Sequence, residues 1–122
     1  MNTTNKEKLD YILEVIGAEV DPQNPDELLK KLNNLINLSG HAAELVAVTE
    51  EQYKRDMLEA YKETIEEKPP STVHSKVLES MVAGASATHT YADRINAALK
   101  LSVEGLRTMI SLYKAETENA TR

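Results

Sequence analysis

The sequence predicts an all-α fold, namely an elongated helical hairpin or small bundle with a long C-terminal helix and a short N-terminal helix. First, apolar residues between Thr72 and Lys114 recur at alternating spacings of three and four, with no proline in the run, which is typical of a long helix packed lengthwise against other helices. Second, the only aromatic residues are five tyrosines, so the apolar residues are mostly aliphatic and suit helix seams. Third, prolines near positions 22 and 69 divide the rest of the chain into helix-length segments. We expect a single all-helical domain, residues 1–122.

The first predicted helix spans residues 5–16. It begins at a capping box, in which the Thr4 hydroxyl and the Glu7 carboxylate bond to free backbone N–H groups. Gly17 follows the last apolar residue, at a position where glycine commonly ends a helix. The apolar residues share one face of this helix; they are Leu9, Ile12, Leu13 and Ile16.

The middle of the chain is predicted to be helical, with one interruption. Asn24 to Glu27 combine an N-cap residue, a proline at the first helical position and two acids in the first turn. Ser39–Gly40 then interrupts the apolar pattern, and glycine costs about 1 kcal/mol in a helix interior. The helix either ends there or bends and continues. We expect a break or kink, which gives helices over residues 26–38 and 42–67.

Lys68 to Ser71 contains two successive prolines and predicts a tight corner into the last helix, residues 72–114. At about 1.5 Å per residue this helix is about 65 Å long, and residues 26–67 reach about 63 Å if they form one helix. The matched lengths favour an antiparallel hairpin. The oligomer or packing seam that we assign to the last helix consists of Leu78, Met81, Ala85, Ile95, Leu99, Leu106, Met109 and Tyr113.

The apolar surface of the last helix is wider than a two-stranded coiled coil requires. One additional row flanks the seam on each side, and an apolar arc this wide contacts more than one partner helix. We therefore expect a homo-oligomer. The flanking rows are Val82, Val103 and Ile110 on one side, and Val77, Tyr91, Ala98 and Leu112 on the other.

Residues 81–88 are unusually small and interrupt the bulky seam. Small side chains let two helix backbones approach closely, so we expect tight packing or a helix crossing here. The alternative is a hinge or a shallow ligand site, because small residues also leave room.

The sequence favours a non-enzymatic protein without a metal or cofactor. It has no cysteine, no glycine-rich phosphate loop and no Gly-x-Ser-x-Gly nucleophile motif. His41 and Glu44 stand three apart, but two ligands do not make a metal site. His89 is expected to be a half-buried, hydrogen-bonded packing residue, and His74 is expected to be exposed. The acidic pairs, Glu50/Glu51 and Glu66/Glu67, point to different helix faces and do not converge for acid–base chemistry.

Charge is unevenly distributed along the chain. The net charge is −6; residues 1–70 carry 15 acids and 8 bases, whereas residues 71–122 carry 5 acids and 6 bases. The acidic excess disfavours sequence-independent nucleic-acid binding by the whole chain. Three bases of the last helix, Lys100, Arg107 and Lys114, recur every seven residues, about 10 Å apart, and are possible phosphate contacts. We expect neither a transmembrane span nor a secretory signal, and hence a cytoplasmic protein.

These observations favour a non-enzymatic oligomerisation and interaction protein, a homo-oligomeric scaffold or adaptor with a possible protein partner and no membrane contact. A nucleic-acid accessory factor is a second hypothesis. In its size, low aromatic content and long C-terminal helix the chain resembles in architecture the small DNA-packaging subunits of tailed phages, and this resemblance implies helical hairpins arranged in a ring. A third hypothesis, motivated by the charge asymmetry, is a small acidic inhibitor of a nucleic-acid enzyme.

Overall fold

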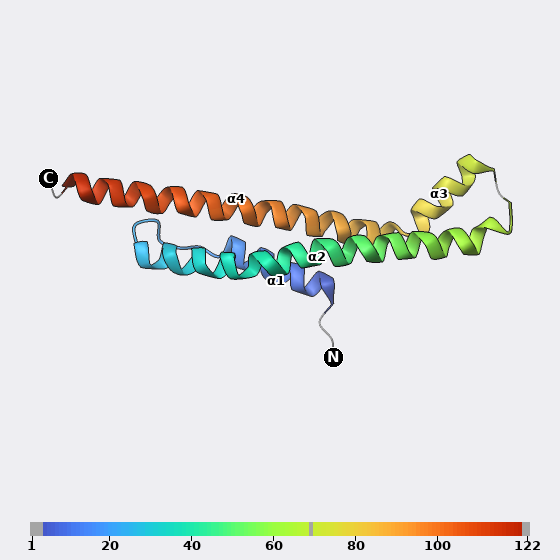
Figure 1. The fold of residues 1–122 in the computed structure, drawn as a ribbon, viewed down its shortest axis with the longest axis horizontal. Coiled ribbons are helices and arrows are strands. Elements are labelled where there is room, and N and C mark those ends of the chain that lie inside the picture. Colours follow the sequence, from blue (N-terminus) through green and yellow to red (C-terminus); the bar gives the residue numbers. More distant parts are fainter. Residues whose placement is uncertain (1–3, 69, 121–122) are drawn as a thin grey trace.

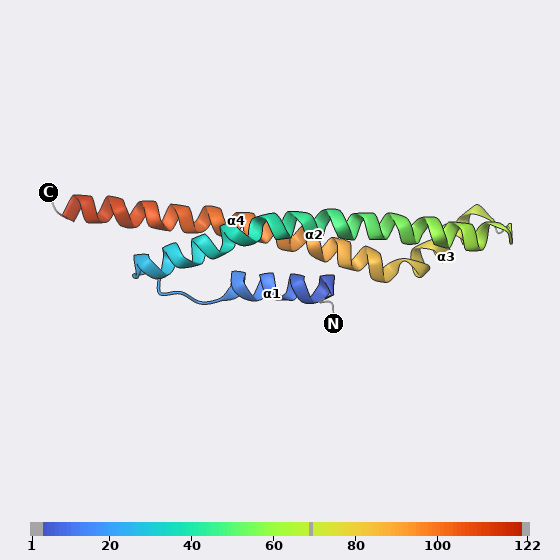
Figure 2. The same ribbon diagram turned by 60° about the horizontal axis from the view of Figure 1, so that its bottom comes forward.

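The computed structural model describes residues 4–68 and 70–120, and every regular element in these ranges is an α-helix. The helices are α1 (Asn5–Gly17), α2 (Pro25–Ile65), α3 (Ser71–Met81) and α4 (Ala83–Ala120). The long helices α2 and α4 run antiparallel beside each other, and α3 diverges from the axis at one end (Figure 1). The shorter α1 lies along the middle of this pair, as the rotated view shows (Figure 2). The predicted all-α helical hairpin is confirmed.

The core lies where α1, α2 and α4 meet. Leu9 and Ile12 of α1, Leu35 of α2 and Leu99 of α4 are at most 2% exposed, and they belong to one continuous apolar cluster. Burying an aliphatic side chain of this size contributes about 1.5–3 kcal/mol. The cluster therefore supplies the main force that holds α1 on the hairpin.

The starts of α1 and α2 form as the sequence predicts. The Thr4 hydroxyl accepts from the Glu7 N–H at 3.1 Å, and the Glu7 carboxylate accepts from the Thr4 N–H at 3.4 Å. The Asn24 side chain accepts from the N–H groups of Asp26 and Glu27. These bonds satisfy backbone donors that a helix start leaves free.

Of the break or kink expected at Ser39–Gly40, the break does not occur, since α2 continues through both residues. The helix instead bends between its teal and green stretches (Figure 2). The Ser39 hydroxyl donates to the carbonyl of Leu35 at 3.0 Å, which is compatible with helix geometry. Leu35 and Ala42, on either side of the glycine, are fully buried in the core. This burial outweighs the cost of about 1 kcal/mol for a helical glycine, so two predicted helices are one.

The expected single helix over residues 72–114 is wrong in its first part. Val82 leaves helical geometry, with φ −106° and ψ 11°, and separates α3 from α4. Its side chain is buried. The small residues that follow provide little side-chain contact to hold a straight continuation. The alternative interpretation of this run as a hinge agrees with the position of the break, while α4 itself extends beyond the predicted end to Ala120.

Candidate interaction surface

The structure divides the predicted seam of the last helix between the core and the surface. Its central members are buried against α1 and α2, so they hold the chain's own helices together. Its outer members lie near the ends of the apolar cluster or outside it. Ile95, Leu99 and Leu106 are buried; Leu78, Ala85 and Tyr113 are half-buried; Met81 and Met109 are exposed.

The difference arises from the helical period. The buried residues of α4 are Ala92, Ile95, Leu99, Val103, Leu106 and Ile110. The five steps from Ala92 to Ile110 average 3.6 residues, which is the period of a straight α-helix, whereas the predicted seam followed the 3.5-residue period of a supercoil. Over several turns the two periods diverge, so Ile110 lies inside and Met109 outside.

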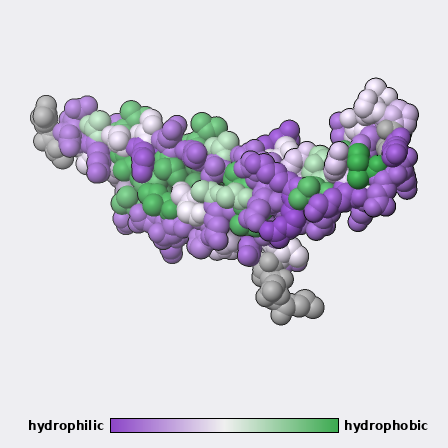
Figure 3. All heavy atoms as spheres, turned by 45° about the vertical axis from the view of Figure 1, so that its right-hand side comes forward, coloured by the Kyte–Doolittle hydropathy of each residue, from purple (hydrophilic) through white to green (hydrophobic). Residues whose placement is uncertain are grey.

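A strip of apolar surface remains on the outer side of α4. We define the α4 strip as Leu101, Gly105, Met109 and Leu112, which follow one another at helical spacings. Leu101 is 69% exposed, Leu112 59% and Met109 38%. Figure 3 shows apolar side chains reaching the surface in the half of the molecule that contains the C-terminal end of α4. The strip is uncovered because Leu101 and Leu112 lie on a different face of α4 from the buried residues Leu99 and Val103.

Sequence reasoning missed Leu101, which falls outside every row assigned to the last helix. A signal was present, because Leu101, Gly105 and Leu112 stand four and seven residues apart on one face. Two apolar residues beside a glycine, on an otherwise polar side of a helix, indicate a second contact surface.

A groove of about 530 Å³ lies between α1 and α2. Its lining combines apolar and polar side chains. We call it the α1–α2 groove; its lining consists of Asn5, Glu7, Lys8, Tyr11, Ile12, Leu38, His41, Glu44, Leu45 and Val48. Tyr11 and Val48 remain 58% and 40% exposed, so the groove presents apolar side chains that no helix of the chain covers.

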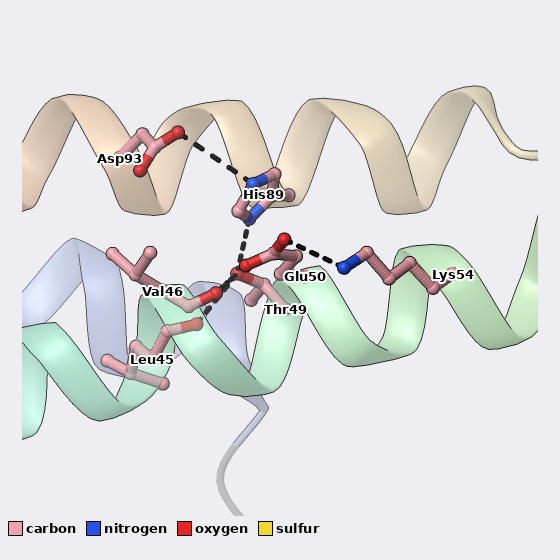
Figure 4. Close-up of polar contacts among 7 residues, drawn as sticks. All are labelled: Leu45, Val46, Thr49, Glu50, Lys54, His89 and Asp93. Atoms are coloured by element: carbon pink, nitrogen blue, oxygen red, sulfur yellow. Dashed lines mark hydrogen bonds and ion pairs between the residues drawn. The ribbon is translucent and has the colours of Figure 1, made fainter.

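Polar contacts fix the relative position of α2 and α4 at mid-length. The Thr49 hydroxyl lies 3.2 Å from Nδ1 of His89, and Nε2 of His89 lies 3.7 Å from the Asp93 carboxylate (Figure 4). Thr49 also donates to the carbonyl of Leu45 at 2.7 Å. The prediction that His89 is a half-buried, hydrogen-bonded packing residue is confirmed.

The prediction that His74 is exposed is wrong. His74 is 9% exposed, its Nε2 lies 2.6 Å from the Thr64 hydroxyl, and its ring contacts Tyr61 with centroids 5.3 Å apart. Because Val82 interrupts the helix, the inward face of α3 is determined by α2 and not by continuation of the α4 stripe. His74 therefore faces α2, and Val73 faces solvent.

Two further contacts alter acid–base behaviour. The Tyr91 hydroxyl donates to the Asp10 carboxylate at 2.6 Å and links α1 to α4; this bond raises the pKa of Tyr91 above its ordinary value. A hydrogen bond from Lys54, at 3.1 Å, lowers the pKa of the Glu50 carboxyl (Figure 4). Both groups lie at the surface, so neither provides the buried environment that acid–base catalysis uses.

The three candidate phosphate contacts, Lys100, Arg107 and Lys114, are all exposed. Among the described residues, none of them forms a salt bridge. They lie on a different side of α4 from the α4 strip, since Lys100 and Leu101 are about 100° apart around the axis. Within residues 4–68 and 70–120 these three cations therefore stand at regular spacing with no ion-pair partner.

In residues 4–68 and 70–120 no group of three His, Cys, Asp or Glu side chains is close enough to hold a metal ion. His41 and Glu44, one helical turn apart, both line the α1–α2 groove. Within the same ranges no helix is both long and apolar enough to cross a bilayer. Comparisons of the chain with protein-family models, curated proteins and solved structures gave no match.

Proposed function

We propose that this protein is a non-enzymatic helical interaction protein that works as a homo-oligomeric scaffold or adaptor. The proposal rests on the apolar surface that the folded chain leaves uncovered. Two leucines of the α4 strip are more than half exposed, although the same helix buries a complete apolar stripe on its other side. Exposed apolar side chains that lie in a row, rather than singly, mark a contact surface.

The elongated shape supports this proposal. A hairpin of two long helices with one short covering helix has a high ratio of surface to volume, and association with further copies buries apolar surface that a monomer leaves in water.

Size-exclusion chromatography with light scattering tests the proposal. We expect the wild-type chain to have a mass of two or more subunits at micromolar concentration. The double variant Leu101→Gln/Leu112→Gln should shift toward the monomer and keep its helical circular dichroism, because both side chains are exposed in the single chain. A wild-type chain that stays monomeric up to about 100 μM, well above the affinity of a specific complex, would contradict the proposal.

The unpaired cations of α4 favour a second candidate function, that of a nucleic-acid accessory factor. Three phosphate contacts per subunit predict an affinity that falls roughly 40-fold between 50 and 200 mM salt. A triple change of Lys100, Arg107 and Lys114 to Gln should abolish binding to duplex DNA. Changing Lys62 and Lys76 to Gln should leave binding intact and serves as the control. Absence of binding by the wild type at about 50 mM salt would exclude this candidate.

A further inference from the structure

We propose that α3 opens as a separate unfolding unit, which leaves α2 and loses its helical structure while the core formed by α1, α2 and α4 stays folded. This end of the molecule then alternates between a closed state, with α3 held on α2, and an open state. The proposal rests on how little of α3 is buried, on a single polar contact with α2 and on the backbone at Val82. It concerns a movement within one chain and is independent of the proposed function.

α3 buries few of its side chains. His74 is the only buried residue among the 11 residues of α3, whereas α1, with 13 residues, buries Leu9 and Ile12. Three apolar side chains of α3 are 38–49% exposed, namely Val73, Val77 and Met81. Because apolar burial is the main force that holds a helix on a core, α3 is held less firmly than α1.

α3 also lacks local features that stabilise helix ends. Pro70, at its N-cap, forms no side-chain hydrogen bond, whereas the side chains of Thr4 and Asn24 cap α1 and α2. The first turn of α3 has no acidic residue and its last turn has no basic residue, so neither end carries a charge that complements the helix dipole. A helix shorter than about 12 residues is marginal without tertiary contacts. We therefore expect α3 to unfold when it leaves α2.

One polar contact attaches α3 to α2. Nε2 of His74 lies 2.6 Å from the Thr64 hydroxyl, and the His74 ring contacts Tyr61 with centroids 5.3 Å apart. The Thr64 hydroxyl also donates to the carbonyl of Ala60 at 2.8 Å within α2. This second bond persists when α3 leaves, and His74 then bonds to water. Opening therefore leaves neither side chain without a hydrogen-bond partner.

Val82 provides the hinge between α3 and α4. Its N–H donates to the carbonyl of Leu78 at 3.1 Å, and its carbonyl accepts from the N–H of Ser86 at 2.9 Å. Val82 thus closes the last bond of α3 and accepts the first bond of α4, and its φ of −106° and ψ of 11° turn α3 away from the axis of α4 (Figure 1). α3 can therefore unfold without the loss of a hydrogen bond within α4.

Opening changes the surface at this end of the molecule. Tyr61 is 46% exposed with His74 beside its ring, and Leu58 and Ile65, on the same side of α2, are 53% and 40% exposed. Departure of α3 uncovers the remainder of Tyr61 together with Thr64. Since these side chains are already partly in water, opening exposes little additional apolar area, and it should require much less free energy than unfolding of the core.

Native-state hydrogen exchange of the wild-type chain, resolved by NMR, tests the separate unit. Relative to the rates of an unstructured chain, the amides from His74 to Met81 should exchange at least about 100-fold faster than those from Ile95 to Leu106. They should share one protection factor, because the unit opens as a whole. Equal protection of the two segments would overturn the proposal, and so would protection that declines steadily toward one end of α3, which indicates fraying.

Substitution of Thr64 tests the contact that holds α3. Thr64→Val removes the hydroxyl and should speed exchange of the α3 amides about five- to tenfold, with no change between Ile95 and Leu106. Thr64→Ser keeps the hydroxyl and should restore the wild-type rates. Thr108→Val is the matched control, because the exposed Thr108 hydroxyl also donates to a carbonyl four residues earlier in its own helix; it should leave α3 unchanged.

The variants separate the possible outcomes. Unchanged exchange of α3 in Thr64→Val would show that this contact does not hold the closed state and would overturn the proposal. Equal acceleration in α3 and between Ile95 and Leu106 would show that α3 unfolds only with the core, and would also overturn it. Far-ultraviolet circular dichroism of Thr64→Val should match that of Thr108→Val, which confirms that the two variants are compared in the same fold.

Discussion

Two threonines of α2, Thr49 and Thr64, each lie within hydrogen-bonding distance of one histidine ring nitrogen. Thr49 donates its hydroxyl hydrogen to the Leu45 carbonyl at 2.7 Å, and Thr64 donates to the Ala60 carbonyl at 2.8 Å. A hydroxyl has one hydrogen to donate, so each oxygen can only accept from the histidine. With the threonine hydrogens on these carbonyls, we expect His89 to carry hydrogen on Nδ1 and His74 to carry it on Nε2. The Asp93 carboxylate, 3.7 Å from Nε2 of His89, is too distant for a hydrogen bond that would favour the other tautomer.

We predict that the two neutral histidines adopt opposite tautomers. Long-range nitrogen–proton NMR correlations distinguish a protonated ring nitrogen from an unprotonated one, and they should show Nδ1–H in His89 and Nε2–H in His74. In Thr49→Val the assignment for His89 should no longer be fixed, while that for His74 remains and serves as the internal control. The Nε2–H tautomer in wild-type His89 would contradict the hydrogen-bond pattern.

The bond between Tyr91 and Asp10 predicts a dependence of stability on alkaline pH. Its donor is the neutral phenol, so its pKa is raised in the folded chain above the unfolded value of 10.0. A group of this kind stabilises the fold fully below its unfolded pKa, and the contribution is lost as pH rises through the folded pKa. Above that range an ionised Tyr91 would also repel the Asp10 carboxylate.

Thermal unfolding of the wild type and of Tyr91→Phe measures this contribution. The wild type should have the higher Tm by a constant margin up to about pH 9, and the margin should shrink above about pH 10. Tyr11→Phe, at an exposed position in α1, is the control and should show no such change. A margin that does not vary with pH would show that the bond does not link α1 to α4 in solution.

At the scale of the element, the face of α4 that packs in the core determines which face stays exposed and available for association. A seven-residue repeat and a 3.6-residue stripe agree over short stretches, but near the C-terminal end they assign different residues to the core. Ile110 is 9% exposed and belongs to the core, whereas Met109 belongs to the α4 strip.

Alanine substitutions at these adjacent positions separate the two descriptions. Ile110→Ala should destabilise the chain by about 2 kcal/mol or more, because it leaves a cavity against α2. Met109→Ala should cost less than about 0.5 kcal/mol when chemical unfolding is measured on the dilute monomer. If Met109→Ala destabilised the chain more than Ile110→Ala, the buried face of α4 would follow the seven-residue repeat of the predicted seam.

The elements show how much of the fold was predictable. Caps and breakers are local, so the starts of α1 and α2 and the end of α2 at Ile65, close to the predicted end, followed from the sequence. Residue 69, within the predicted corner, lies outside the described residues. Gly40 and Val82 were not predictable in the same way, because tertiary contacts outweigh propensity at both positions. Burial of Leu35 and Ala42 keeps α2 helical through Gly40, and contacts of His74 with α2 direct α3 away from α4.

The candidate surface was predictable only in part for the same reason. The sequence shows that α4 has more apolar surface than one partner helix can cover. It does not show which face of α4 packs against α1 and α2, and this orientation buries Ile95 and Leu99 and leaves Leu101 and Leu112 exposed.

At the scale of the whole molecule, the chain is a rod whose apolar surface is only partly covered by its own helices. Its core occupies the stretch where three helices meet, and the α4 strip and the α1–α2 groove lie at the border of that stretch. Both surfaces belong to the same chain, so association with further copies would bury apolar side chains that the chain's own helices leave exposed.

Sedimentation equilibrium of the wild-type chain over about 1–100 μM tests this central claim most directly. The account predicts a mass that rises with concentration from 13.6 kDa, the mass of one chain, to that of a dimer or larger closed assembly, by mass action. A mass that remains 13.6 kDa over the whole range would contradict it.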